Sequence, residues 1–327
     1  MKILIEVPSW LGDAVMTTPA IETLLSQFDK PEVTLVGSFS SVQLLKNHPK
    51  VKRVSILKKN FFSLLKIAKN LGHFDVYFSF RTSLRAKFFK TLISSNIKYQ
   101  FVNDNNQNIH QVKKYNDFIN ESLSINTSPG KLIIHRDNNI KKEVLDLYGS
   151  QDLTIGINPG ASYGSAKRWY PNEFAEVAAK LSKKYNIIIF GGNTEQDIAT
   201  DIENLLVKKN ISNYQNLSGK TSIEELIEHI SNLNLLITGD SGPMHIAAAL
   251  EVPTVSIFGP TRAQETSQWM NKKSLIVKKD LDCQPCMNRT CQLKHHNCMK
   301  YIKSEEVLNA VNSLKLNYQK LDQLNDR

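Results

Sequence analysis

The feature that most constrains the fold of this chain is an alternation of short apolar runs with segments of helical spacing, which occurs twice. In the first half, runs of strand length lie at residues 1–7, 33–37, 51–57 and 75–80, and helical patterns at 14–28, 41–47 and 61–71. Parallel strands need crossover connections, and helices usually supply them. The alternation therefore predicts a parallel sheet with helices on both faces.

The second half repeats this rhythm. Strand-like runs lie at residues 153–160, 186–192, 233–240 and 252–261, and helical patterns at 171–185, 194–209, 222–231, 241–250 and 304–321. Pro171 stands near the start of one helix, and Ser222 with Glu225 predicts a capping box for another. Between residues 120 and 151 the pattern breaks into INTSPG, RDNN and YGSQ. We therefore expect an α/β protein with two Rossmann-like domains facing a cleft, residues 1–150 and 151–327.

Length and composition agree with a globular protein. A chain of 327 residues can build two ordinary domains, and 41% hydrophobic with 22% charged residues is ordinary globular usage. No stretch approaches the ~20 apolar residues of a membrane helix. The start, MKILIEVPSW, lacks the features of a signal peptide. The sequence predicts a cytoplasmic protein that neither spans nor crosses a membrane.

The net charge of +10 is unevenly distributed. Residues 1–150 hold 21 Lys and Arg against 12 Asp and Glu, whereas residues 151–327 hold 20 against 19. Between Val42 and Gln100 there are 13 basic residues and a single acid, Asp75. This excess of positive charge indicates an anionic partner, and nucleic acid, anionic lipid headgroups or a phosphorylated glycan would each satisfy it.

Two loops of the second half resemble phosphate sites. The run from Gly239 to Gly242 follows a strand and opens a helix directly, an arrangement that attracts phosphate. Gly160, Lys167 and Arg168 lie in a second loop between a strand and a helix, where the two cations suit a diphosphate. Neither loop has a dinucleotide fingerprint, and the chain lacks a P-loop. Nicotinamide chemistry is therefore disfavoured.

Asp13 poses a separate question in the first half, because it stands where a strand has ended and a helix begins. One interpretation is an N-cap, since Asp accepts a hydrogen bond from a free amide of the first turn. The other is a catalytic carboxylate, since ligands of open α/β sheets bind beyond the carboxyl ends of the strands.

The motifs WLGDAVMTTPAI, PGASYGSAKRWYP, GDSGPMHIAAALEVPTVSIFGPT and CQPCMNRTCQLKHHNCM together resemble the ADP-heptose:lipopolysaccharide heptosyltransferases, most closely those of the heptosyltransferase II type. The resemblance runs from Met1 to about Tyr301 and implies the two-domain GT-B fold. In that fold the N-terminal domain holds the acceptor and the C-terminal domain holds the nucleotide sugar.

The resemblance also implies roles for single residues. Asp13 would be the general base for the acceptor hydroxyl, and Arg81 and Arg85 would lie on the acceptor side. Lys167 would hold the donor phosphates and sugar and would be the second catalytic residue. Donor-binding residues would further include Gly160, Arg168, Glu195, Asp240, Ser241, Gly242 and His245.

All four cysteines of the chain lie within 16 residues, in the pattern C-x2-C-x4-C-x6-C, with His295 and His296 among them. Cys283, Cys286, Cys291 and Cys298 are compatible with a structural zinc ion, with a disulfide and with reduced thiols. None of these states would make them catalytic. No cofactor or metal is expected to be required, and zinc is not the favoured state.

The resemblance thus implies a metal-independent inverting glycosyltransferase that moves heptose from ADP-L-glycero-D-manno-heptose to the first heptose of the lipopolysaccharide inner core. It would work at the inner face of the inner membrane as a peripheral protein on an anionic surface, with no nucleic-acid partner. Rivals in the same class are heptosyltransferase I and a related transferase with another nucleotide sugar. From other classes, a non-catalytic binder of phosphorylated glycan or lipid headgroup and a GT-B-like epimerase stay open.

Overall fold

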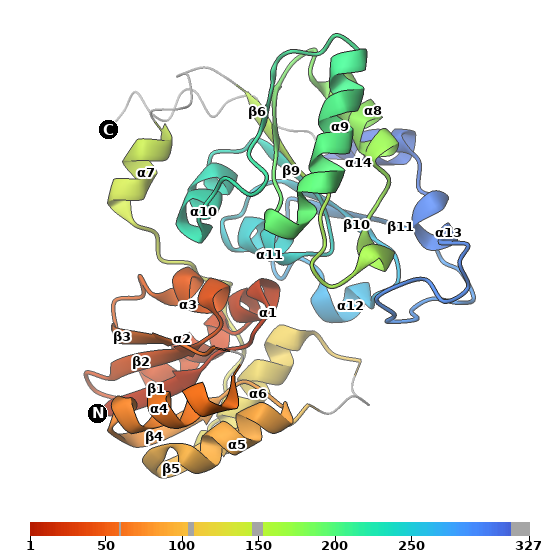
Figure 1. Ribbon diagram of the computed structural model, residues 1–327. Coiled ribbons are helices and arrows are strands. Elements are labelled where there is room, and N and C mark those ends of the chain that lie inside the picture. Colours follow the sequence, from red (N-terminus) through yellow and green to blue (C-terminus); the bar gives the residue numbers. More distant parts are fainter. Residues whose placement is uncertain (59, 104–107, 146–152, 315–327) are drawn as a thin grey trace. The chain divides into compact units, whose positions relative to one another are not determined.

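The computed structural model describes residues 1–58, 60–103, 108–145 and 153–314. It divides into two compact units (Figure 1). The first comprises residues 1–137 and 264–269, and the second comprises the described parts of 138–263 and 270–327. Each unit contains one parallel β-sheet, so the predicted α/β fold with two Rossmann-like units is confirmed.

The sheet of the first unit has five parallel strands in the order β3-β2-β1-β4-β5. The strands are β1 Lys2–Glu6, β2 Glu32–Gly37, β3 Val51–Ile56, β4 His73–Ser79 and β5 Ser94–Gln100. The order of the chain through the sheet reverses between β1 and β4, and loops beyond the carboxyl ends of these two strands are where such sheets bind ligands.

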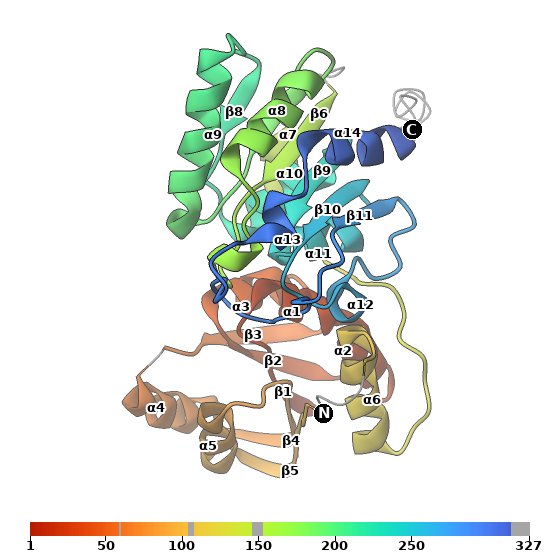
Figure 2. The ribbon, with the colours of Figure 1, turned by 90° about the vertical axis from the view of Figure 1, so that its right-hand side faces the viewer.

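Helices cover both faces of this first sheet. They are α1 Leu11–Met16, α2 Thr18–Ser26, α3 Phe39–Leu45, α4 Phe61–Leu71, α5 Leu84–Leu92 and α6 Gln111–Leu123. Helices α4 and α5 pack together over one face through a buried cluster that includes Leu4, Leu64, Tyr77 and Phe89 (Figure 2). On the other face α1 packs on α3, and α2 on α6.

The single helix expected at residues 14–28 is instead two helices, α1 and α2, that meet at Thr17. Pro19 lacks the amide hydrogen that would continue the helical hydrogen bonds. The hydroxyls of Thr17 and Thr18 instead donate to the carbonyls of Ala14 and Val15, at 2.7 and 2.8 Å. The local sequence therefore ends α1 shortly after Asp13.

The sheet of the second unit has six parallel strands in the order β8-β7-β6-β9-β10-β11. The strands are β6 Thr154–Asn158, β7 Asn186–Ile189, β8 Tyr214–Asn216, β9 Leu235–Gly239, β10 Thr254–Phe258 and β11 Ser274–Lys278. This is the Rossmann order, and it reverses between β6 and β9, which pair directly.

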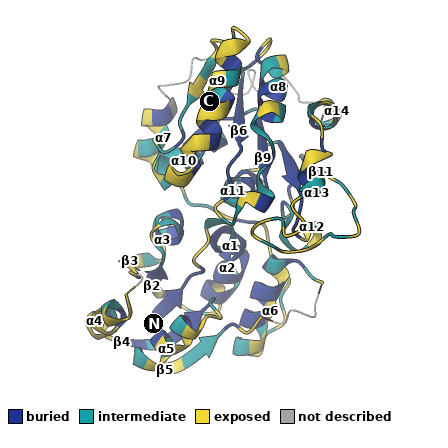
Figure 3. Cartoon of the chain, turned by 45° about the vertical axis from the view of Figure 1, so that its right-hand side comes forward, coloured by how far each residue is buried: buried dark blue, intermediate teal, exposed yellow. Residues whose placement is uncertain are grey.

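One face of the second sheet carries the larger buried cluster, to which α8, α9, α13 and α14 contribute. Helices α10 and α11 pack together, and α7 packs on α10. Figure 3 shows buried strands and helices whose outer faces are exposed. The helices are α7 Asn138–Leu145, α8 Pro171–Leu181, α9 Gln196–Lys208, α10 Ile223–Ser231, α11 Gly242–Ala249, α13 Asn297–Lys300 and α14 Ser304–Ser313, with short 3-10 turns at η1 Ser165–Lys167 and η2 Asn193–Glu195. Helix α12 Ala263–Thr266 begins at the last residue of this stretch of the second unit and continues into the first unit.

All the apolar strands that the sequence predicts are present in the structure. Three strands at the edges of the sheets, β5, β8 and β11, are not predicted by the sequence. These strands are only partly buried or short, so they lack a continuous apolar run. The capping box of Ser222 and Glu225 is confirmed. The predicted boundary at residues 150/151 lies outside the described residues, and contacts place α7 with the second unit.

No helix in the described ranges combines the length and apolar character needed to cross a membrane.

Candidate functional site

The loops after β6 and β9 meet at the switch point of the second sheet. Asn158 ends β6, and its side-chain amide donates to the hydroxyls of Ser241 at 3.1 Å and Thr238 at 3.2 Å. Asn158 and Thr238 are both buried. The two loops are therefore held together by hydrogen bonds at the edge where ligands bind.

Lys167 and Asp240 form the central ion pair of this edge. The Lys167 ammonium lies 2.6 Å from Asp240 Oδ2 and 3.3 Å from the Asp240 carbonyl oxygen. Both side chains are largely buried, 13% and 5% exposed, and the Thr261 hydroxyl donates to the same carboxylate oxygen at 2.6 Å. A lysine fixed in this way is aimed at the loop that opens α11, rather than extended into water.

Helix α11 starts at this edge. Ser241 is its N-cap, yet within the described chain the Ser241 side chain makes no capping hydrogen bond to the first turn. Pro243 lies in the first turn, and the side chains of the next two residues, Met244 and His245, are buried. The first amides and the helix dipole favour an anion at this helix start, where Ser241 and Gly242 lie.

Glu195 and Gly160 lie against each other on the β6 side of the site. A Cβ at Gly160 would come within 2.3 Å of the Glu195 carboxylate, so only glycine fits beside this carboxylate. Glu195 is buried, accepts from the Gly192 amide at 2.9 Å and from the Ser162 hydroxyl at 3.2 Å. The structure thus places the predicted Gly160 and Glu195 together.

Arg168 behaves differently from its neighbour Lys167. Its guanidinium lies 3.7 Å from the carboxylate of Asp197 in α9, which is 71% exposed. Of these two adjacent cations, only Lys167 pairs with Asp240 among the described contacts. The structure therefore separates a lysine at the helix terminus from an arginine on the flank.

The cysteine-rich segment supports the lysine loop, a role that the sequence did not indicate. The Ala166 amide donates to the Arg289 carbonyl at 3.0 Å, and His296 Nε2 donates to the Ala166 carbonyl at 2.9 Å. Tyr163 donates to the Met287 carbonyl at 2.6 Å, and its ring lies 4.8 Å from the Lys167 ammonium. Residues 287–296 therefore brace both sides of the turn that carries Lys167.

The four cysteines are free thiols, of which Cys298 is buried and Cys286 exposed. Burial, and the charges of the other three thiols, raise the pKa of Cys298 to about 11. Within the described chain, three candidate ligand atoms lie within 4.8 Å of one another only at Glu22, His48 and His135, so no three cysteine sulfurs form such a cluster.

In the first unit, Asp13 lies in the first turn of α1, but Trp10 is the N-cap, so the N-cap interpretation of Asp13 is wrong. Tyr115 of α6 is buried beneath this turn. Burial raises the pKa of Tyr115 well above its usual range, and the charge of Asp13 and a hydrogen bond to it raise it further. Tyr115 therefore stays protonated and holds the Asp13 carboxylate in place.

Arg81 and Arg85 lie beyond β4, the strand beside β1. The Arg81 guanidinium is 3.2 Å from the carboxylate of Glu6, which is fully buried at the end of β1 and also accepts from Tyr77 and Ser79 at 2.6 and 2.7 Å. Burial raises the pKa of Glu6 despite these partners.

Burial, and then the charge of Arg81, lower the pKa of Arg85, which donates to the Lys58 carbonyl. Only Arg81 pairs with the buried Glu6 carboxylate among the described contacts, whereas Arg85 donates to a backbone carbonyl, so this site has an excess of positive charge.

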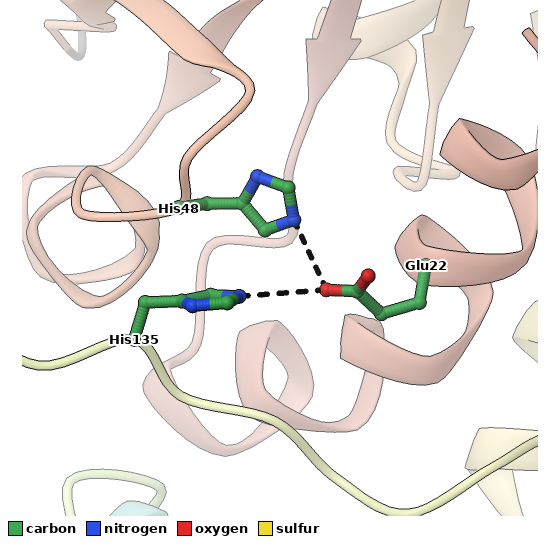
Figure 4. Close-up of side chains that lie close together, drawn as sticks. All are labelled: Glu22, His48 and His135. Carbon is green, nitrogen blue, oxygen red and sulfur yellow. Dashed lines mark hydrogen bonds and ion pairs between the residues drawn. The ribbon is translucent and has the colours of Figure 1, made fainter.

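Glu22, His48 and His135 converge from α2, the turn after α3 and the segment before α7 (Figure 4). His48 Nε2 and His135 Nε2 lie 3.0 and 3.6 Å from the same Glu22 oxygen. The Lys50 amide donates to His48 Nδ1 at 3.1 Å, so the ring hydrogen is on Nε2 and points at Glu22. A metal would need the lone pair of that nitrogen, so His48 is placed to donate a hydrogen bond to Glu22 and not to bind a metal. His135 Nε2 lies near the same oxygen but makes no hydrogen bond within the described chain.

Comparisons with known proteins show which family the chain resembles. A family profile described as glycosyltransferase family 9 (heptosyltransferase) matches residues 79–297. The chain is 40% identical to lipooligosaccharide heptosyltransferase 2 of Campylobacter jejuni subsp. jejuni, over 96% of this chain and 98% of that protein.

Two solved structures share the fold. One is the E. coli ADP-heptose lps heptosyltransferase II, with a TM-score of 0.80, 21% identity and coverage of 96% of this chain and 98% of the other. The second is the E. coli heptosyltransferase WaaC with ADP-2-deoxy-2-fluoro heptose, with a TM-score of 0.71, 16% identity and coverage of 96% and 99%.

Proposed function

Since this chain belongs to glycosyltransferase family 9, the heptosyltransferase family, we propose that it transfers heptose from ADP-heptose to the first heptose of the lipopolysaccharide inner core. The near full-length similarity to a heptosyltransferase 2 carries this proposal. The second unit binds the nucleotide sugar, and the first unit binds the acceptor.

On the donor side, the diphosphate lies at the start of α11, where it meets the amides of Ser241 and Gly242 and the ammonium of Lys167. The ammonium has three hydrogens, so it can keep Asp240 while it donates to phosphate. Asp240 also faces hydroxyls of the heptose. Glu195, buried beside Gly160, takes the ribose, while His245 and Arg168 complete the donor surroundings.

On the acceptor side, Asp13 is the general base, and the hydrogen bond from Tyr115 supports its orientation. Arg81 and Arg85 bind anionic groups of the core, because Glu6 neutralises only one of the two charges. Glu6 acts through Arg81 and is a positioning residue.

The reaction is a single displacement with inversion. An acceptor hydroxyl oxygen attacks the anomeric carbon of the heptose, Asp13 takes the hydroxyl proton, and the bond from that carbon to the diphosphate oxygen breaks. ADP leaves with the electron pair. Charge grows on the diphosphate in the transition state, where Lys167 and the helix terminus stabilise it.

No metal ion is required in this proposal, because Lys167 and the start of α11 can neutralise the leaving group. Asp280 and Asp282 do form an Asp-x-Asp run, but both are exposed, and Asp280 pairs with Lys278 at 2.6 Å. The protein acts at the cytoplasmic face of the inner membrane as a peripheral protein, where its acceptor is anchored.

Product analysis tests the proposed function. The protein is incubated with ADP-heptose and with cores that stop before or after the first heptose, with and without EDTA, and products are weighed by mass spectrometry. We expect one added heptose only on the core that already carries the first heptose, in both buffers. Product on the shorter core would assign heptosyltransferase I specificity, and donor loss without an acceptor would assign an epimerase-like or hydrolytic activity. Donor binding without any product would assign a binding protein.

A further inference from the structure

Large apolar side chains are exposed at the carboxyl edge of the first sheet. Phe61 and Phe62, which follow β3, are 55% and 80% exposed. Leu84, which follows β4, is 83% exposed, and Val102, which follows β5, is 81% exposed. All strands of this sheet are parallel, so these side chains stand at the same edge as the loop that leads from β1 to Asp13.

The core does not need these residues. Helix α4 packs through Leu64, Ala68 and Leu71, and α5 through Ala86 and Phe89. The outward-facing apolar residues of the two helices instead form a second apolar group. The rings of Phe61 and Phe88 are 5.8 Å apart, and Leu65 and Phe88 are 49% and 40% exposed. The exposed apolar residues therefore span α4 and α5, which lie side by side with exposed outer positions (Figures 2 and 3). Contiguous exposed apolar surface of this kind marks an interaction site.

Cations surround this apolar surface. Lys58, Lys66, Lys69 and Lys87 are exposed on the same two helices and the loop before α4. The one acid between Val42 and Gln100 is Asp75, and its carboxylate accepts a hydrogen bond from the Lys2 amide at 2.7 Å. Apolar side chains interleaved with lysines and almost free of acids complement an anionic lipid surface, where rings and chains enter the headgroup layer and ammonium groups meet phosphates.

We infer that Phe61, Phe62, Leu65, Leu84 and Phe88, with the lysines around them, form a membrane-docking surface for an anionic bilayer. The inference deepens the proposed function and rests on it for the reason why a bilayer should be present. A surface at the carboxyl edge of the sheet brings a lipid-anchored acceptor to the edge that carries Asp13. Binding combines apolar insertion with charge, so salt alone does not abolish it.

Vesicle binding without substrates tests this inference apart from activity. Cosedimentation is measured with phosphatidylcholine vesicles and with vesicles that also contain phosphatidylglycerol. The compared proteins are the wild type, the double variant F62D/L84D and the control V207D, because Val207 is also apolar and 57% exposed but lies on α9 of the second unit. Thermal unfolding checks that all three proteins are folded.

We expect binding to the anionic vesicles by the wild type and V207D, and partitioning lowered at least about tenfold in F62D/L84D. Equal binding by the double variant, or no wild-type binding to anionic vesicles, would overturn the inference. A wild-type dimer that becomes monomeric in F62D/L84D would also overturn it and assign the surface to contact between copies. Turnover of the wild type on a delipidated core tests the proposed function separately.

Discussion

Lys167 Nζ lies 2.6 Å from Oδ2 of Asp240, the same carboxylate oxygen to which Thr261 donates. This ion pair joins the loop after β6 to the loop after β9 at the point where the strand order reverses. The carboxylate holds the ammonium beside the start of α11. The donor site therefore has its cation oriented before any substrate binds.

Replacing Lys167 by methionine should weaken both donor binding and the chemical step. The diphosphate is charged in the ground state and gains charge in the transition state, so the loss of the ammonium acts on both. We expect a raised KM for ADP-heptose and kcat lowered about 100-fold, measured as ADP release. The control is K183M, because Lys183 is an exposed lysine of the same unit. If K167M keeps both parameters of the wild type, the diphosphate does not bind at this lysine.

Asp13→Asn should abolish transfer while donor binding stays intact. The amide has the shape of the carboxylate but cannot take a proton, and loss of one general base typically lowers the rate 10²- to 10⁴-fold. Single-turnover rates and the Kd for ADP-heptose would be compared with D29N, which alters an exposed aspartate of the same unit. Y115F should show a smaller loss, about tenfold, since it removes only a positioning hydrogen bond. Full transfer by D13N would make Asp13 a structural residue of α1.

His296→Ala should raise the KM for ADP-heptose about fivefold, although His296 touches no substrate in the proposed function. Its imidazole donates to the Ala166 carbonyl and accepts from the Tyr170 hydroxyl at 3.2 Å, so it links the cysteine-rich segment to the turn that carries Lys167. H295A changes the adjacent histidine, which only accepts from the Asn297 amide among its described contacts, and it serves as the control. Partial rescue by H296Q would support positioning, and equal effects of H295A and H296A would contradict it.

The sequence predicts those parts of the site that depend on neighbouring residues, and it does not predict those that depend on contacts between residues far apart in the chain. The loops at Gly160 and Ser241 follow apolar strands directly, so periodicity and glycine placement locate them at the sheet edge. The brace between His296 and Ala166 joins residues 130 positions apart, and no local pattern marks it. Glu6 lies in an apolar run, where its burial and its pairing with Arg81 depend on β4 lying beside β1. The sequence signal for this arrangement is an acidic residue within an apolar run, which indicates a buried polar network.

Glu22 should make folding stability pH-dependent in the acid range. Hydrogen bonding from His48 is the main cause that lowers the pKa of Glu22 below its usual 4.5, against the effect of burial. A lowered pKa means that the folded state favours the carboxylate, so the contribution is present above pH 4.5 and is lost as the pH falls through the folded pKa. At pH 6 the free energy of unfolding, measured with urea, should be higher for the wild type than for E22Q. The difference should be less than ~1 kcal/mol, because the group is partly solvated. The two curves should converge near pH 3; a constant difference would contradict the linkage.

Charge reversal at Arg81 and Arg85 together should raise the apparent KM for the acceptor and leave that for ADP-heptose almost unchanged. Glu6 pairs with Arg81, whereas Arg85 donates to the Lys58 carbonyl, so the site has net positive charge that suits phosphates or acidic sugars of the core. For the same reason, added salt should weaken acceptor binding more than donor binding, since exposed charges are screened over ~8 Å at physiological ionic strength. Steady-state kinetics with each substrate varied at several salt concentrations measures both effects. The variant K183E/K184E reverses two adjacent exposed lysines of the second unit and controls for net charge. If R81E/R85E matches this control and the two substrates respond equally to salt, the arginines are a solvated face and the acceptor's anionic groups bind elsewhere.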